Sequence, residues 1–213
     1  QSEKGRQLFM AMLRRGTEKN FNVTQVLRFM FGIRLPVAGG RPSSLLGLIL
    51  PQLEEVRDTP QGSFHEGLTV AQHTLNVVEQ TEKQIKAGVV SEKDAFTQLF
   101  LSLVHDLGKY AGSAGQHKRT LALLPGVFSS LQAETVGAPG LQYVERQRIT
   151  HLIGVHAGLG NIAAQNLRGR MSRGERRRRV KELAAKLLEA ARNKLAPDEE
   201  ALKLAELLYH STI

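Results

Sequence analysis

Apolar residues recur along the chain at helical spacing, and the sequence shows almost no strand pattern. After Ser91 they fall at intervals of three and four, on one face of a helix: Phe96, Leu99, Phe100, Leu103 and Val104. Similar stripes predict helices over 8–13, 23–31, 45–56, 66–87, 120–132, 141–156, 180–195 and from 197 onward. Alternating β-branched runs bounded by tight turns are nearly absent. The pattern therefore predicts an all-α fold built as a helical bundle.

Single residues mark several of the predicted helix ends. Ser91, with Asp94 three positions later, forms a near capping box at a helix start. Gly108 is expected to end the buried helix that precedes it, as glycine commonly does. Pro125 is expected to break the 120–132 segment, because proline has no amide hydrogen to donate inside a helix. We expect an N-terminal helical extension over residues 1–60 and a helical, metal-binding domain over residues 61–213.

Composition narrows the function classes. The 213 residues include 29 Lys and Arg against 20 Asp and Glu, a formal charge of +9, which favours polyanionic partners such as nucleotides or nucleic acids. With no cysteine there is no disulfide, no zinc–thiolate site and no thiol nucleophile. No run approaches the roughly 18 apolar residues that a membrane span requires. We therefore expect a cytoplasmic protein with no membrane partner.

Two neighbouring residues, His105 and Asp106, offer ligands for a metal. They lie about 100° apart around a helix, so one cation can contact an imidazole nitrogen and a carboxylate oxygen. His73 and His156 are also placed on inward helix faces by their spacing from apolar neighbours. A lone histidine on an apolar face is more often a core residue, so the prediction rests on the combination. These ligand types suit Mn, Fe, Ni, Zn or Mg, in no order that the sequence can rank.

The segments Phe64-His-Glu-Gly-Leu-Thr-Val-Ala-Gln-His-Thr-Leu75 and Leu103-Val-His-Asp-Leu-Gly-Lys109 resemble the HD superfamily of metal-dependent phosphohydrolases. Within that superfamily, residues 48–54 and 58–61 resemble the HD region of bacterial tRNA CCA-adding enzymes. The resemblance covers about residues 45–160. It implies an HD-domain helical bundle that binds divalent metal and hydrolyses phosphate esters.

The resemblance also implies roles for individual residues. His73, His105 and Asp106 match the first three metal ligands of the family, and Lys109 matches its phosphate-facing lysine. Asp106 and Lys109 are thus the catalytic candidates. The remaining candidates are His117 and His156 as ligands of a second metal, and Lys118 and Arg119, with Lys109, as groups that bind substrate oxygens. The family's final aspartate has no match, so Glu206 or His210 takes its place, or the site is incomplete.

An arginine-rich segment carries a second hypothesis. Residues 168–179 lie next to the predicted amphipathic helix 180–195. Five arginines fall in the last seven positions of this segment: Arg173, Arg176, Arg177, Arg178 and Arg179. Such a cluster suits salt-sensitive contact with nucleic-acid phosphates. It is otherwise a solvated helix start, although cations are unfavourable near the positive end of a helix dipole.

Two functions follow from these features. The first is a phosphomonoesterase or phosphodiesterase that acts with a divalent metal on a nucleotide, cyclic nucleotide or RNA-end phosphate ester. The alternative is a catalytically degraded HD-like module that binds nucleic acid or a protein partner through the arginine-rich segment. The expected partner is therefore a phosphorylated small molecule or a nucleic acid, and the sequence leaves the substrate, the metal and the oligomeric state open.

Overall fold

The computed structural model describes residues 3–61, 67–112, 114–131 and 140–154, with residues 172, 174, 175, 178, 179 and 182. This part of the chain is mostly helical, which confirms the all-α class. Its sheet has two short antiparallel strands, β1 (Arg34–Leu35) and β2 (Ser43–Ser44). Among these residues, none of the helices combines the length and apolar content that a membrane crossing needs.

The chain divides into two compact units, Gln1–Arg146 and Gln147–Ile213. The helices of the first unit are α1 (Glu3–Arg14), η1 (Arg15–Thr17), α2 (Val23–Gly32), α3 (Pro51–Val56), α4 (Val70–Lys86), α5 (Glu92–Val104), η3 (Leu107–Ala111) and α6 (Gln116–Ser130), where η denotes a 3₁₀ helix. Residues 143–154 are also helical. The boundary expected at 60/61 does not coincide with this division, because residues 1–60 belong to the same unit as α4, α5 and α6.

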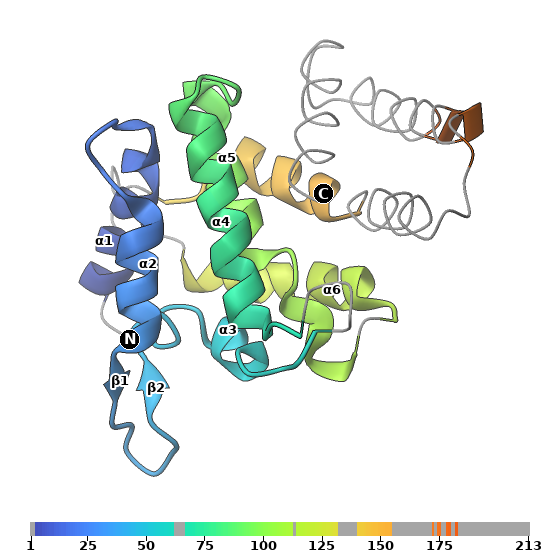
Figure 1. Cartoon of the computed structure of the whole chain (residues 1–213). Helices are drawn as coiled ribbons and strands as arrows, with labels where there is room; N and C mark the ends of the chain where they lie inside the picture. Colours follow the sequence, from blue (N-terminus) through green and yellow to red (C-terminus); the bar gives the residue numbers. More distant parts are fainter. Residues whose placement is uncertain are drawn as a thin grey trace. The chain divides into compact units, whose positions relative to one another are not determined.

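Helices α4 and α5 form the centre of the first unit. Helix α4 packs against α2 and α5, and α5 also packs against α1 (Figure 1). Every residue of α5 from Asp94 to Val104 is buried, which is more than the single apolar stripe in its sequence indicates. Helix α4 begins at Val70, later than the expected position 66, because Thr69 and Gln72 form a capping box that satisfies two amide groups at its start.

The predictions at Ser91 and at Pro125 have different outcomes in the structure. Ser91 is the N-cap residue of α5, but its hydroxyl donates to Asp94 Oδ2 at 2.5 Å and accepts no bond from a helix amide. The expected break at Pro125 is wrong: α6 runs from Gln116 to Ser130 with Pro125 inside it. Proline costs a helix about 3 kcal/mol, and here Leu124 and Val127, both buried, keep the helix on the core.

Gly108 does not end α5, which was the expected role. Helix α5 ends at Val104 with His105 as its C-cap, and Gly108 lies further on, in η3. A Cβ at this position would lie 2.0 Å from Gln116 O and 2.6 Å from Thr120 N of α6. Glycine is therefore needed because η3 and α6 approach each other too closely for any side chain.

We expect Gly108→Ala to destabilise the protein by about 1–3 kcal/mol, the usual cost of overpacking, because the methyl group must push η3 away from α6. Gly126→Ala is the matched control. Gly126 is exposed within α6, and its Cβ would meet only Gln52 Nε2, at 3.9 Å. The Gly126→Ala variant should gain up to about 1 kcal/mol in free energy of unfolding from its higher helix propensity. Urea unfolding measures both, and equal stability of the two variants would contradict the close approach.

A buried glutamate joins α2 to α4. The Glu82 carboxylate accepts hydrogen bonds from Val23 N at 2.9 Å, Thr24 N at 3.0 Å and Thr24 Oγ1 at 2.6 Å, and it pairs with Lys86. Burial alone would raise the pKa of Glu82, but Lys86 and these donors outweigh it and lower the pKa below its usual value. Glu82 thus supplies the negative charge and the acceptors that the buried amides at the first turn of α2 require.

The sign of this shift predicts how stability depends on pH. Because the folded-state pKa of Glu82 lies below the unfolded value of about 4.3, its stabilisation is present above that pH and is lost as the pH falls through the folded pKa. At pH 7, Glu82→Gln should reduce the free energy of unfolding by roughly 1.5–3 kcal/mol. Urea titrations down to pH 3 should show this gap narrowing. A gap that stays constant with pH, or an equal loss in the exposed control Glu55→Gln, would refute the assignment.

Candidate metal centre

The packing of α4 against α5 brings His73, His105 and Asp106 together. His73 lies in α4, His105 is the C-cap of α5, and Asp106 precedes η3. His105 Nε2 lies 3.4 Å from His73 Nε2 and 3.3 Å from Asp106 Oδ2, and the third distance, from His73 Nε2 to Asp106 Oδ2, is 3.6 Å. Among the described residues this is the one group of three or more ligand-type side chains that can hold a metal ion.

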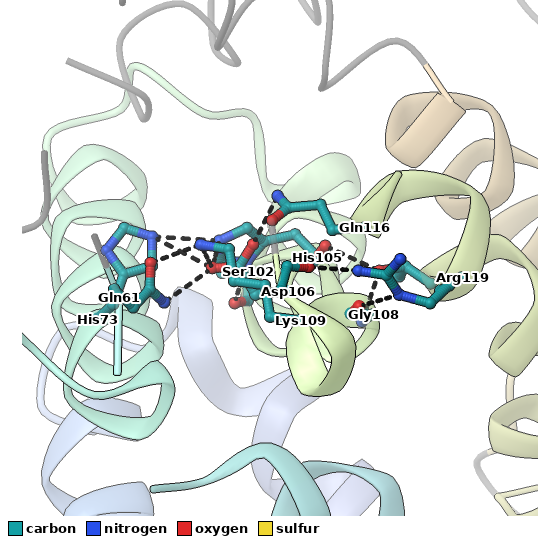
Figure 2. A network of polar contacts seen from close by, with 11 residues as sticks. Gln61, His73, Ser102, His105, Asp106, Gly108, Lys109, Gln116 and Arg119 are labelled. Atoms are coloured by element: carbon teal, nitrogen blue, oxygen red, sulfur yellow. Dashed lines mark hydrogen bonds and ion pairs between the residues drawn. The ribbon is translucent and has the colours of Figure 1, made fainter. Parts of the chain in front are cut away.

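The orientation of His105 is fixed by its other ring nitrogen. Nδ1 lies 2.9 Å from the Ser102 carbonyl oxygen. Because a carbonyl only accepts, Nδ1 carries a proton, and Nε2 points toward His73 and Asp106 (Figure 2). A bond of this kind on the outer nitrogen orients many metal-binding histidines.

The spacing and the charge of the three donor atoms both fit a cation. Two ligands that each bind a metal at about 2.1 Å with tetrahedral angles lie about 3.4 Å apart, close to the three distances here. Two imidazole nitrogens and a carboxylate oxygen can all turn lone pairs toward one point, which suits a cation placed among them. A metal that binds there displaces any proton that these atoms hold.

The Asp106 carboxylate is only 2% exposed and is surrounded by donors. Its Oδ2 accepts from Lys109 Nζ at 2.7 Å and Gln61 Nε2 at 3.1 Å, while Oδ1 accepts from Gln116 Nε2 at 3.2 Å. Burial alone would raise the pKa of Asp106, but His105 and Lys109 outweigh it and hold the pKa well below its usual range. Asp106 is therefore ionised at neutral pH and available as a ligand.

Side chains of helix α6 bind the backbone of the segment 105–114, which contains the His105-Asp106 pair. Thr120 Oγ1 accepts from Gly108 N at 2.9 Å and donates to the His105 carbonyl at 3.3 Å. The Arg119 guanidinium donates to the carbonyls of Gly108 and Ala114 at 2.6 and 2.8 Å, and also to the Gly112 carbonyl. Arg119 thus fixes the backbone after the motif in place, and a role for it in binding substrate stays a prediction.

The other predicted site residues are placed as follows. Lys109 is buried beside Asp106, whereas Lys118 on α6 is exposed and His117, half-buried on the same helix, is not part of the cluster. Arg178 and Arg179 pair with Glu182 and Glu175 at 3.7 and 3.0 Å. The predicted residues that lie outside the described part of the chain are His156, Arg173, Arg176, Arg177, Glu206 and His210.

Sequence reasoning missed four residues of this site: Gln61, Ser102, Gln116 and Thr120. Ser102 contributes a backbone carbonyl, which leaves no signal in a sequence. Gln61 lies in a segment that resembles CCA-adding enzymes, but nothing in the sequence marks its amide as a contact of Asp106.

Comparisons with protein-family models, with curated proteins and with solved structures found no match. The HD resemblance therefore rests on the motif residues and their arrangement, and membership of that family stays a prediction.

We expect Asp106→Asn to destabilise the chelator-treated, metal-free protein by about 3–5 kcal/mol, because it leaves the buried Lys109 ammonium without a counter-charge. The double variant Asp106→Asn/Lys109→Met removes both charges and should recover most of that loss. Urea unfolding of the wild type and of Asp106→Asn, Lys109→Met and the double variant measures the coupling directly. Additive losses would show that the two charges do not stabilise each other.

Proposed function

We propose that this chain is a metal-dependent phosphohydrolase that acts on the phosphate ester of a nucleotide, a cyclic nucleotide or an RNA end. The observation that carries the proposal is the convergence of His73 Nε2, His105 Nε2 and Asp106 Oδ2 within 4.8 Å of one another. The buried cation Lys109 lies directly beside them. Two imidazoles, a carboxylate and a lysine are what a divalent metal and a phosphate together need.

Some residues of the site would bind the metal, and Lys109 would contact the substrate. His73, His105 and Asp106 would hold a divalent cation such as Mn, Fe, Ni, Zn or Mg. When bound, such an ion supplies a Lewis acid for a phosphoryl oxygen and lowers the pKa of water toward neutrality. Ser102 keeps the His105 ring turned toward the site through its carbonyl. Lys109 brings a compact positive charge to the phosphoryl oxygens.

The competing hypothesis is an HD-like module that binds nucleic acid or a protein partner through its arginine-rich segment. Of those arginines, Arg178 and Arg179 are described, and both pair with glutamates four residues away. Pairing of this kind is ordinary for a solvated helix, so no specific observation favours this alternative and it stays a prediction.

The deciding experiment is metal uptake by purified wild type, His105→Ala and the control His151→Ala. His151 is a half-buried histidine in the helical segment 143–154, outside the described cluster. After chelation and incubation with Mn, Fe, Ni, Zn or Mg, elemental analysis should find at least one equivalent in the wild type and in the control. His105→Ala should retain less than a tenth as much.

The metal-loaded wild type should then hydrolyse p-nitrophenyl phosphate or bis(p-nitrophenyl) phosphate, and His105→Ala should not. Wild type that takes up none of the five metals would overturn the proposal. So would metal-loaded protein that leaves these esters and a panel of nucleotides and RNA ends intact. Salt-dependent RNA binding that persists in His105→Ala would then favour the alternative.

A further inference from the structure

Gln61 is anchored by its backbone next to the start of α4. Its amide donates to the Leu68 carbonyl at 2.8 Å, and the adjacent residues Pro60 and Thr69 form an isolated antiparallel bridge. Val70 N also donates to Thr59 O at 2.9 Å. These bonds tie the position of Gln61 to the first turn of the helix that carries His73.

The side chain of Gln61 links the two charged residues of the site. Its Oε1 accepts from Lys109 Nζ at 2.5 Å, and its Nε2 donates to Asp106 Oδ2 at 3.1 Å. Because an ammonium only donates and a carboxylate only accepts, the orientation of the amide follows without ambiguity. The side chain is buried, so both bonds form away from bulk water. Figure 2 shows Gln61 beside His73, in contact with Lys109 and Asp106.

Through these two bonds, Gln61 affects the surroundings of one ligand atom, Asp106 Oδ2. Asp106 Oδ2 is the oxygen nearest to both imidazoles, and Lys109 Nζ lies 2.7 Å from it. A metal ion and the ammonium therefore compete for the lone pairs of this oxygen. The Gln61 carbonyl gives the ammonium a second acceptor, so Asp106 Oδ2 does not satisfy the Lys109 charge alone.

We infer that Gln61 is a positioning residue of the candidate metal centre: it shares Lys109 with Asp106 and so limits the hold of the ammonium on Oδ2, the oxygen that a cation would contact. The inference rests on the proposed function. Without the Gln61 carbonyl, the Lys109 ammonium keeps Asp106 as its acceptor and moves fully onto it. Metal then has to displace a buried ion pair, and its affinity falls.

The test measures Mn²⁺ affinity by calorimetry for wild type, Gln61→Met and Gln98→Met. Outer residues that orient metal ligands typically contribute about 10–100-fold in affinity, so Gln61→Met should bind Mn²⁺ at least tenfold more weakly than wild type. Gln98→Met is the matched control. Gln98 is also 6% exposed, and its Nε2 has no hydrogen-bond partner. Its affinity should stay within threefold of wild type.

A second variant separates positioning from a merely structural role. Gln61→Glu keeps an acceptor for Lys109, so it should bind Mn²⁺ at least as tightly as wild type even if Gln61→Met folds poorly. Thermal unfolding of each metal-free variant reports any loss of stability separately. A purely structural role predicts lower melting temperatures with unchanged Mn²⁺ affinity in both variants.

The outcomes distinguish this inference from the proposed function. Wild type that binds Mn²⁺, with Gln61→Met within threefold of it, overturns the role of Gln61 alone. Gln61→Glu that binds Mn²⁺ tenfold more weakly than wild type also overturns it. Wild type that takes up no divalent metal overturns the proposed function and this inference together.

Discussion

The arrangement of the helices around the candidate site depends on one buried negative charge. A carboxylate that is 2% exposed is costly unless donors and opposite charge surround it. Asp106 meets this requirement from four directions: Lys109 in its own segment, the α3–α4 connection through Gln61, α5 through His105 and α6 through Gln116. Each contact constrains the element that supplies it. The charge therefore helps to specify how these segments pack, whatever chemistry takes place there.

A second constraint is steric: the backbones of η3 and α6 lie very close together at Gly108. The 3₁₀ helix η3 contacts α6 through the backbone of Gly108, and Thr120 bonds to the backbone on both sides of Asp106. Arg119 binds three carbonyls of the same segment. Short polar and charged groups thus hold a turn that has little apolar surface of its own. As a result, the carboxylate is presented to the histidines from a rigid support.

The amino-acid sequence predicted the parts of this arrangement that depend on local pattern. The apolar spacing before His105 located the buried helix, and the adjacency of His105 and Asp106 marked the ligand pair. The contacts of Gln61 with Asp106 and of Gly108 with α6 join positions far apart in the chain, and only the tertiary packing determines them. The expected break at Pro125 failed for the same reason, because burial of the neighbouring apolar residues outweighs local propensity.

The burial of α5 has a consequence for the timescale on which the site can rearrange. From Asp94 to Val104 every residue of this helix is buried, at most 7% exposed, so we expect its amide hydrogens to exchange with solvent mainly when the surrounding helices separate. His105 continues directly from that helix and shares its protection. A ligand that arrives at the imidazole therefore meets a scaffold already ordered, and none of its binding free energy is consumed in ordering α5. The contacts that must rearrange when a cation binds are those of the side chains around Asp106.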